Sequence, residues 1–584
     1  MRRFSLQLTL FVAVASVTGL EEARAQEFAW AGQVDATTGG SATHVAVDGS
    51  GDVLITGGFA GTADFDPGPG TYNITAAGDY ADAFVWKLDT AGSLVWAKTM
   101  GGTRTTSGRA IAVDPSGNIY TAGSFYGTAD FDPGPGTYNM TAVSYFDTYV
   151  SKLDAVGNFV WAKQIAGGTG SQVYAMNLAL DPSGNLYTVG YFFHAADFDP
   201  GPGTHTLTAV GSSDVFVLKL DNSGNFVWVD QLGGRFREEA YGIAVDSIGN
   251  VYTVGNFEDR VDFDPGPSTY SMISYSFSDS FVWKLNAGGS LVWAKQLEGG
   301  TYQMGAYGYG VAVSASGDAN VVGVFSNIVD FDPGPASHLL VSGDNPSAFV
   351  LKLNTNGNFV WAEQLSGGST GRALANDVAI DLTGNIYAVG DFSSGPVDFN
   401  PGTVTYNLTP AGDQDAFIAK LDSAGNFVWA GGLGGTSADY GEGVAVDKSG
   451  NVYSTGYFSG TADFNPGPGT FDLTSAASHD PFVSKLAQTP APTFTDKTTF
   501  AWRSLFGETA YNLYRSDIAV PGTFFCLASH LSGASATDVA EPAVGTLYAY
   551  LVTAVDAAGQ EGTMGSEEVN GNPTSERPNS NPCP

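Results

Sequence analysis

The 584-residue sequence predicts an all-β protein, with a seven-bladed β-propeller followed by a small β-sandwich. Two observations support this prediction. Glycine is abundant, with 77 residues, and short runs rich in Val, Tyr, Phe and Thr lie between the glycines, as in strands joined by tight turns. A segment close to Asp-Phe-Asp-Pro-Gly-Pro-Gly also recurs along the chain, and its copies begin at Asp64, Asp130, Asp197, Asp262, Asp330, Asp398 and Asp463.

Alignment of the copies predicts four strands in each repeat. In the second copy the first strand covers Ala110–Asp114 and the second covers Ile119–Gly123. The turn between them contains Gly117 and Asn118, which tolerate the positive φ of a short hairpin. The third and fourth strands are typified by Phe84–Leu88 and Phe159–Ala162. A four-stranded antiparallel unit that repeats radially is a propeller blade.

The two ends of the array predict how the ring closes. Six repeats carry a fourth-strand tryptophan, at Trp96, Trp161, Trp228, Trp293, Trp361 and Trp429. The seventh repeat stops after Phe482–Leu486, and the missing Phe-x-Trp-Ala pattern occurs instead at Phe28–Ala31. An N-terminal strand that completes the last blade removes the exposed sheet edges. We therefore expect the N-terminal strand to close seven blades over residues 26–488.

The first 25 residues predict export of the protein. Arg2 and Arg3 precede an apolar run from Leu6 to Val17, and residues 23–25 (Ala-Arg-Ala) fit the small-x-small cleavage pattern of a signal peptide. The apolar run is too short for a transmembrane helix. The formal charge of −35 repels phosphate backbones and anionic lipids. We expect a secreted or cell-surface protein with no nucleic-acid partner and no membrane insertion.

Two recurring runs support a family resemblance. The patterns Ala-Val-Asp-x-x-Gly-Asn and Phe-Val-x-Lys-Leu recur over residues 26–488, and they resemble the secreted bacterial propeller repeats called SBBP repeats. The resemblance implies the propeller fold, and it carries no catalytic motif. The Asp-Phe-Asp-Pro-Gly segment is an addition to the family pattern.

A second resemblance covers residues 489–570. Its strand-like runs Phe500–Trp502, Tyr511–Arg515 and Tyr548–Gly559 resemble a fibronectin type III domain, a β-sandwich that usually acts as a spacer or an adhesive module. The resemblance implies a core role for Trp502 and a corner hydrogen bond from Tyr548 or Tyr550.

The C-terminal end of the chain also contains both cysteines. An exported compartment permits a disulfide between Cys526 and Cys583, although sequence alone does not establish their geometry. Residues 571–584 are polar and rich in proline, and we expect a tail there.

Paired carboxylates in the recurring segment suggest a metal site. Asp64 and Asp66 alternate around Phe65, so an extended backbone points both side chains the same way and offers oxygen ligands to Ca²⁺. The other hypothesis is that these carboxylates accept hydrogen bonds from turn amides. In the last two copies Asn400 and Asn465 replace the second aspartate. The candidate calcium ligands are Asp64, Asp66, Asp130, Asp132, Asp197, Asp199, Asp262, Asp264, Asp330, Asp332, Asp398 and Asp463.

Other polar residues are interpreted as structural. A lysine recurs in every third strand, and in six repeats an aspartate precedes it by five residues, as Asp82 precedes Lys87, which predicts ion pairing between blades. The six histidines include no metal-type pair, and no nucleophile elbow or phosphate loop is present.

The loops after the second and fourth strands share one end of the blades. That end carries the recurring segment and connections of varied sequence, among which residues 235–239 (Arg-Phe-Arg-Glu-Glu) are the most varied chemically. Variable loops on a rigid scaffold usually carry binding specificity. We expect a non-enzymatic binding, adhesion or surface scaffold protein whose partner is an extracellular protein or a glycan. The alternative is a polysaccharide lyase or glycoside hydrolase with an acidic site at the channel mouth.

Overall fold

The computed structural model describes residues 26–300, 305–343, 345–365 and 371–488, and the backbone of six strands between Thr493 and Val555. The described residues form strands and turns, and they contain no helix that is long and apolar enough to span a bilayer. The prediction of an all-β protein is confirmed. The chain divides into two compact units, one of residues 26–487 and one that contains residues 488–584.

Each repeat in the first unit begins with an inner strand and continues with a second strand paired antiparallel to it. The inner strands are β3 (Gly39–Val47), β9 (Thr106–Val113), β15 (Gln172–Leu180), β21 (Glu238–Val245), β27 (Ala306–Val313), β33 (Arg372–Ile380) and β39 (Tyr440–Val446). The second strands are β4 (Val53–Ala60), β10 (Ile119–Phe125), β16 (Leu186–Phe193), β22 (Val251–Phe257), β28 (Ala319–Phe325), β34 (Ile386–Ser393) and β40 (Val452–Phe458).

The sheet of each repeat continues outward through a third strand and a fourth strand. The third strands are β7 (Asp82–Leu88), β13 (Asp147–Leu153), β19 (Asp214–Leu220), β25 (Asp279–Leu285), β31 (Ser347–Leu353), β37 (Gln414–Leu421) and β43 (Asp480–Gln488). The fourth strands are β8 (Leu94–Gly102), β14 (Phe159–Gly167), β20 (Phe226–Leu232), β26 (Leu291–Gly299), β32 (Phe359–Leu365) and β38 (Phe427–Gly435). The inner and fourth strands extend beyond their predicted bounds toward the end with the variable loops.

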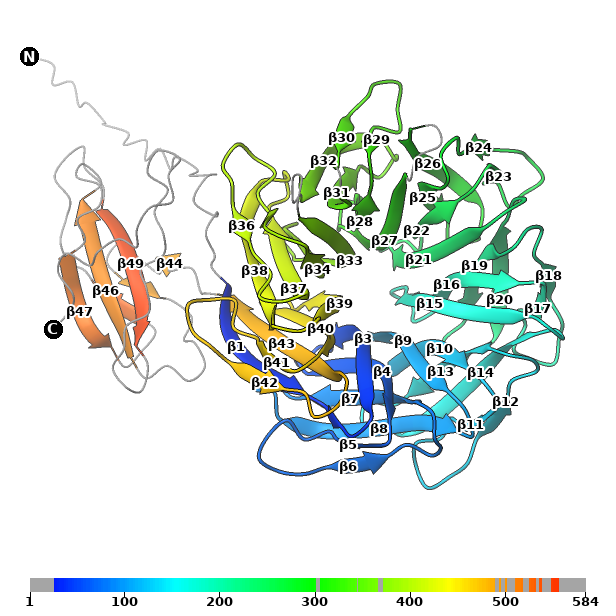
Figure 1. Cartoon of the computed structure of the whole chain (residues 1–584), viewed down its shortest axis with the longest axis horizontal. Coiled ribbons are helices and arrows are strands. Elements are labelled where there is room, and N and C mark those ends of the chain that lie inside the picture. The colour runs from blue at the N-terminus through cyan, green and yellow to red at the C-terminus, as the bar shows by residue number, and fades with distance from the viewer. Residues whose placement is uncertain are drawn as a thin grey trace, which may run out of the picture. The chain divides into compact units, whose positions relative to one another are not determined.

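The N-terminal strand β1 (Gln26–Gln33) lies at the outer edge of the last repeat, in a sheet of order β1-β43-β40-β39. The Val34 amide just after β1 donates a 3.0 Å hydrogen bond to the carbonyl of Pro481. Each inner strand contacts the inner strand of the next repeat, and β39 contacts β3. Figure 1 shows these sheets arranged around a common centre.

The recurring segment forms a short hairpin, and in four repeats this hairpin extends the sheet of the preceding repeat, while β23-β24 and β35-β36 form separate two-stranded sheets. The hairpin strand β11 (Thr128–Asp130), for example, pairs with the end of β8, where Ala129 lies opposite Gly102. In the first repeat, β5 (Thr62–Asp64) pairs instead with β2 (Asp35–Ala36), which follows β1. The remaining hairpin strands are β6 (Asn73–Thr75), β12 (Asn139–Thr141), β17 (Ala195–Asp197), β18 (Thr206–Thr208), β23 (Arg260–Asp262), β24 (Ser271–Ile273), β29 (Ile328–Asp330), β30 (Leu339–Val341), β35 (Val397–Asp398), β36 (Asn407–Leu408), β41 (Thr461–Asp463) and β42 (Asp472–Thr474).

The phenylalanine of the recurring segment is a core residue. Phe65 has no exposed surface and packs against Phe59 and Phe84, with ring centroids 5.2 and 5.5 Å away. Its backbone carbonyl accepts a 2.9 Å hydrogen bond from Trp86 Nε1. Burial of an aromatic ring of this size anchors the hairpin to the sheet.

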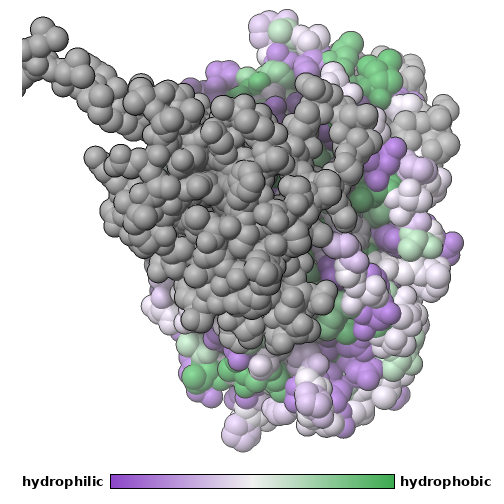
Figure 2. All heavy atoms as spheres, turned by 90° about the vertical axis from the view of Figure 1, so that its left-hand side faces the viewer, coloured by the Kyte–Doolittle hydropathy of each residue, from purple (hydrophilic) through white to green (hydrophobic). Residues whose placement is uncertain are grey.

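The surface of the first unit carries apolar side chains singly. The exposed valines of the fourth strands, such as Val95 and Val160, recur once in each of several repeats. On the face shown in Figure 2, hydrophilic and hydrophobic residues are interspersed.

The C-terminal unit contains two three-stranded antiparallel sheets. Their orders are β44-β45-β48 and β47-β46-β49. The strands are β44 (Thr493–Phe494), β45 (Thr499–Ala501), β46 (Ala510–Asp517), β47 (Phe525–Leu531), β48 (Ser535–Thr537) and β49 (Tyr548–Val555). The side chains of the predicted Trp502 core residue, the corner tyrosines and both cysteines lie outside the described residues. The sandwich and the disulfide therefore stay predictions.

Candidate functional site

The inner strands differ chemically from repeat to repeat at one position. Each inner strand leads into a run such as Ala112-Val113-Asp114, whose last residue is Asp in six repeats and Ser314 in the fifth. The residue five places before this last residue varies. These residues are Thr43, Arg109, Met176, Tyr241, Tyr309, Asn376 and Glu442. Arg109 is exposed and the others are half-buried. We call this set, with the residues that contact it below, the inner-strand site.

Tyrosines form three ring pairs near these positions. Tyr241 lies edge-on to Tyr309, with ring centroids 5.4 Å apart, and its hydroxyl donates a 2.6 Å hydrogen bond to Glu239 Oε2. Tyr440 and Tyr457 stack at 4.7 Å. The third pair is Tyr174 with Tyr191, at 5.4 Å. Tyrosine presents a broad apolar face with a polar tip, which suits binding of partly apolar ligands.

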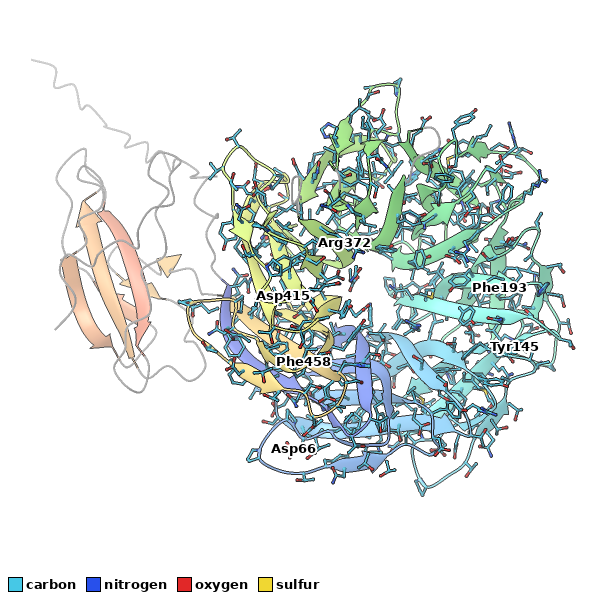
Figure 3. The ribbon with its side chains drawn as sticks, viewed as in Figure 1. Asp66, Tyr145, Phe193, Arg372, Asp415 and Phe458 are labelled. Carbon is cyan, nitrogen blue, oxygen red and sulfur yellow. The ribbon has the colours of Figure 1, made fainter. Side chains whose placement is uncertain are left out.

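Three carboxylates of the inner-strand site have raised pKa values. The pKa of Glu442 is raised to about 7, chiefly by burial and also by the charges of Asp391 and Asp377, while the charge of Arg109 lowers it. Glu442 lies on β39 and Arg109 on β9, and the inner strand β3 contacts both of these strands, so one repeat separates the two residues. Figure 3 shows Arg372 at the inner edge of the sheets.

Asp391 lies beside the same cluster. Burial raises its pKa to about 6, against the lowering effects of its hydrogen bond from Asn376 and the charge of Arg372. Asn376 Nδ2 donates to Asp391 Oδ1 at 3.1 Å and also to the Gly441 carbonyl at 2.9 Å. The Asn376 amide therefore connects the Asp391 carboxylate to the next repeat.

Deeper along the inner strands, Asp377 joins three repeats. Its carboxylate accepts hydrogen bonds from the Val444 amide at 2.9 Å and the Val378 amide at 2.8 Å. Burial raises the pKa of Asp377, and the charge of His44 opposes that effect. His44 Nδ1 is buried and has no hydrogen-bond partner among the described residues. The site therefore combines acidic, basic and aromatic groups that differ from repeat to repeat, and within the variable column only tyrosine occurs twice.

The candidate calcium ligands lie at the outer edge of the ring, one segment in each repeat. Figure 3 shows Asp66 in this position. Asp64 Oδ1 accepts hydrogen bonds from the amides of Asp66 at 3.0 Å and Tyr72 at 2.7 Å, and Asp66 Oδ1 accepts one from Gly68 at 2.9 Å. The same bonds recur in the other six copies. This is the bonding that the turn hypothesis predicts.

The structure does not gather these carboxylates into one site. Within the described residues, no group of three or more His, Cys, Asp or Glu side chains is placed to hold a metal ion. Calcium binding by the loops stays a prediction.

The sequence predicts that the recurring lysines form ion pairs between blades. This prediction is wrong for the lysines whose ion pairs the structure describes, because each of them pairs within its own repeat. Lys87 pairs with Asp48 at 2.8 Å, in the first hairpin of its own repeat. Asp82 lies at the other end of the same strand and accepts hydrogen bonds from the amides of Ala77 and Gly102. Five residues of strand span about 17 Å, so Lys87 and Asp82 are too far apart to pair.

The contact between repeats is instead a hydrogen bond to a backbone carbonyl. Lys219 Nζ donates to the Ala287 carbonyl of the next repeat at 3.1 Å, and Trp228 Nε1 donates to the same oxygen at 3.2 Å. Lysine and tryptophan therefore recur together because they share one acceptor.

Sequence reasoning missed the inner-strand site. It selected residues 235–239 as a loop, whereas β21 begins at Glu238 and Glu239 contacts Tyr241. The signal was present in the alignment, as one variable column inside a strand that otherwise repeats. Residues that repeat reveal the shared structure of the blades, whereas a binding site depends on residues that differ between them.

Two family models match short parts of the chain. One described as a beta-propeller repeat (SBBP) matches residues 95–127, 160–191 and 429–464, as the predicted resemblance implied. One described as a sperm-tail PG-rich repeat matches residues 465–501, which include the last Pro-Gly segment.

Two curated proteins are similar to this chain. It is 25% identical over 445 residues to the uncharacterized WD repeat-containing protein L264 of Acanthamoeba polyphaga mimivirus. The aligned segment covers 64% of this chain and 32% of that protein. It is 31% identical over 145 residues to the regulatory protein FlaEY of Caulobacter vibrioides. Here the aligned segment covers 25% of this chain and 14% of that protein. The chain thus spans about a third or less of the length of these relatives.

Solved propellers also align with the chain. The WD40 β-propeller domain of Doa1 is 9% identical, with a TM-score of 0.38, over 79% of this chain and 97% of that one. Sqt1 from Chaetomium thermophilum is 13% identical, with a TM-score of 0.35, over 79% of this chain and 100% of that one. Given the matched repeat model and the all-β sheets around a common centre, the chain is a β-propeller repeat protein.

Proposed function

We propose that the chain is an exported binding protein, in which a seven-bladed propeller closed by its N-terminal strand presents the inner-strand site to an extracellular protein or glycan. One observation carries the proposal: chemical variation is concentrated at one position midway along the inner strands, which Arg109, Tyr241 and Glu442 occupy in their repeats. The hairpins after the first and third strands and the recurring Asp-Phe-Asp-Pro-Gly segments keep nearly the same sequence in every repeat. A rigid scaffold with one varied surface is typical of binding proteins.

The residues of the site favour a ligand with hydroxyl or amide groups and partly apolar faces. Paired tyrosines supply aromatic surface, and Arg109 and Arg372 supply fixed donors. Asp391 and Glu442 accept hydrogen bonds when ionised. The acidic character of the whole chain disfavours polyanionic ligands.

A binding screen with matched variants tests this proposal. The protein from residue 26 onward is applied to immobilised neutral and acidic polysaccharides and to extracellular matrix proteins. Tyr241→Ala with Arg109→Ala should reduce retention on the bound polymer at least tenfold. Ser116→Ala with Ser183→Ala, in hairpins at the opposite end, should not change it. Retention on no polymer, or equal loss with the hairpin variants, would overturn the proposal.

A second candidate function is hydrolysis or elimination on a polysaccharide. The observation that favours it is the presence of Glu442 and Asp391, each found in one repeat only, with pKa values raised to about 7 and about 6. Groups that titrate near neutral pH serve as general acids and bases. Release of reducing ends or unsaturated products by the wild type, lost in Glu442→Gln, would support an enzyme over a binding protein.

A further inference from the structure

One position of the fourth strands differs at the junction of the third and fourth repeats. The residue two places after the fourth-strand tryptophan is Lys98, Lys163 or Lys295 in three repeats, and Asp230 in the third repeat. This position lies under the hairpin of the following repeat and beside its Pro-Gly loop. Glu363 holds the position in the fifth repeat and Gly431 in the sixth, so Asp230 is one of two acidic side chains at a place that lysine fills in three repeats.

The lysines at this position fill a groove. A Cβ atom built on Gly224 would lie 2.8 Å from Lys163 Cε and 3.2 Å from its Cγ, so the lysine stem runs directly beneath the hairpin glycine. Lys98 lies in the same way beneath Gly157, and Lys295 beneath Gly357. The groove thus has the width and the lining that an extended alkylammonium chain requires.

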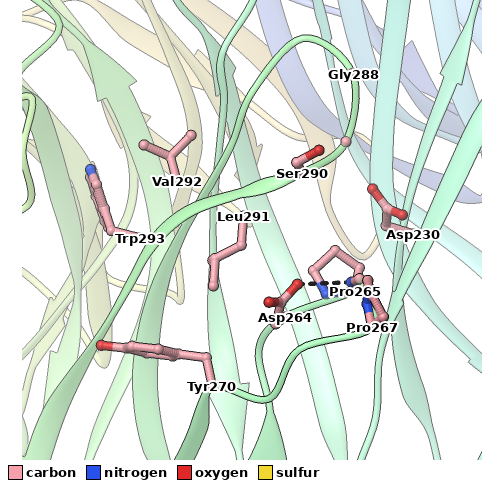
Figure 4. Close-up of a pocket in the computed structure, with 12 residues that line it drawn as sticks. Asp230, Asp264, Pro265, Pro267, Tyr270, Gly288, Ser290, Leu291, Val292 and Trp293 are labelled. Atoms are coloured by element: carbon pink, nitrogen blue, oxygen red, sulfur yellow. Dashed lines mark hydrogen bonds between the residues drawn. The ribbon is translucent and has the colours of Figure 1, made fainter.

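At the third repeat the Asp230 carboxylate lies directly beneath the hairpin glycine Gly289, and a pocket opens beside it. A pocket of about 480 Å³ lies between the hairpin at Gly288–Ser290, the loop at residues 264–267 and the rings of Tyr270 and Trp293, with Asp230 at its side (Figure 4). Asp230 does not fill this pocket. In aspartate one side-chain carbon precedes the charged group, whereas in lysine four carbons precede it.

The Asp230 carboxylate lacks a donor. Its Oδ2 atom is buried and has no hydrogen-bond partner among the described residues. Burial raises the pKa of Asp230 to about 7. A buried carboxylate oxygen without a donor is unfavourable, so a ligand group that donates to this carboxylate offsets that cost. Asp264, in the adjoining loop, adds a second negative charge to the lining.

We propose that this pocket binds a lysyl side chain of a protein partner, with its ammonium group at Asp230 and its stem in the groove that Lys163 fills one repeat earlier. The rings of Tyr270 and Trp293 provide aromatic surface for a cationic group. The net charge of −35 attracts basic partners. This site lies on fourth strands and their loops, apart from the inner-strand site, and does not depend on the function proposed for it.

The repeats supply the variants for a test. Asp230→Lys introduces the residue that three other repeats carry and should fill the pocket. Asp230→Ala keeps the pocket and removes the charge. Glu363→Lys makes the same kind of change at the equivalent position of the fifth repeat and serves as the matched control. Unchanged thermal unfolding midpoints would show that all three variants fold.

The probe is Nα-acetyl-lysine methylamide, titrated into the protein from residue 26 onward and followed by calorimetry and ligand-observed NMR. The wild type and Glu363→Lys should bind one equivalent with equal affinity. Asp230→Lys should abolish binding, and Asp230→Ala should weaken it at least tenfold. The uncharged analogue Nα-acetyl-norleucine methylamide should not bind.

Three results would overturn the proposal. The first is no saturable binding to the wild type. The second is binding that Asp230→Lys leaves intact or that Glu363→Lys reduces equally. The third is binding of Ca²⁺ or glucosamine at Asp230 without binding of the lysine probe, which would assign the pocket to a different cation.

Discussion

Trp30 and Lys485, near opposite ends of the propeller sequence, donate hydrogen bonds to the same backbone oxygen, that of Thr90. The distances are 3.2 Å from Trp30 Nε1 and 2.9 Å from Lys485 Nζ. Trp293 and Lys284 share the Thr355 carbonyl in the same way, within one continuous stretch of chain. The N-terminal strand therefore makes the contact to the next repeat that a fourth strand makes elsewhere.

This equivalence predicts that Trp30→Ala destabilises the whole propeller. The substitution removes a half-buried ring and its hydrogen bond at the junction of the two chain ends, and it should cost about 2–3 kcal/mol. Calorimetric unfolding of the protein from residue 26 onward measures the effect.

Trp293→Ala is the control, because it removes the same contact inside the array. If the N-terminal strand closes the ring, both variants should lower the unfolding midpoint to a similar extent in a single transition. A Trp30→Ala midpoint equal to that of the wild type would contradict ring closure by this strand.

The buried carboxylates predict that stability falls as pH rises through neutrality. Burial raises the pKa of Asp439 to about 7, of Glu238 to about 8 and of Asp415 to about 6. Between about pH 4 and these values the folded protein binds more protons than the unfolded chain, so the free energy of unfolding decreases as pH increases. The unfolding midpoint should be higher at pH 5 than at pH 8, whereas a midpoint that rises over this range would contradict the prediction.

Glu238 offers a single-site version of this test. It has no exposed surface, and its Oε2 accepts a 2.7 Å hydrogen bond from the Gly234 amide. Glu238→Gln keeps an acceptor without a charge, so it should raise the free energy of unfolding at pH 8 by about 1–3 kcal/mol and change it little at pH 5. Denaturant titration at the two pH values checks this, and an equal effect at both would show that ionisation of Glu238 is not the cause.

The recurring aspartates allow the turn and calcium hypotheses to be separated. Asp64→Ala removes the acceptor of two amides and should cost about 1–3 kcal/mol in either case. Asp66→Asn keeps the acceptor, as Asn400 and Asn465 do in their loops. If the loops bind calcium, unfolding midpoints measured in Ca²⁺ and in EDTA should differ for the wild type, and Asp66→Asn should reduce the difference. Equal midpoints at saturating Ca²⁺ would contradict the calcium hypothesis.

The features that repeat were predictable, because each repeated residue has the same structural reason in every copy. Phe65 is buried, Asp64 accepts turn amides, and Trp96 marks an outer strand. The pairing of four recurring hairpins with the preceding repeat, such as Ala129 opposite Gly102, was not predicted. That pairing joins residues of different repeats through three-dimensional proximity, which a comparison of repeats with one another does not reveal.

Arg109 tests whether the inner-strand site is one electrostatic unit. Arg109 lowers the pKa of Glu442 against the effects of burial and of Asp391, although the three residues come from separate repeats. Arg109→Met keeps an aliphatic stem and removes the charge, so the pKa of Glu442 should rise above its value of about 7. Carboxyl ¹³C NMR of glutamate-labelled protein measures the titration, with Glu442→Gln to assign the signal. Lys98→Met, which removes a cation from an outer strand, should leave the Glu442 pKa unchanged, and an equal rise in that variant would mean that net charge, and not proximity of Arg109, sets the value.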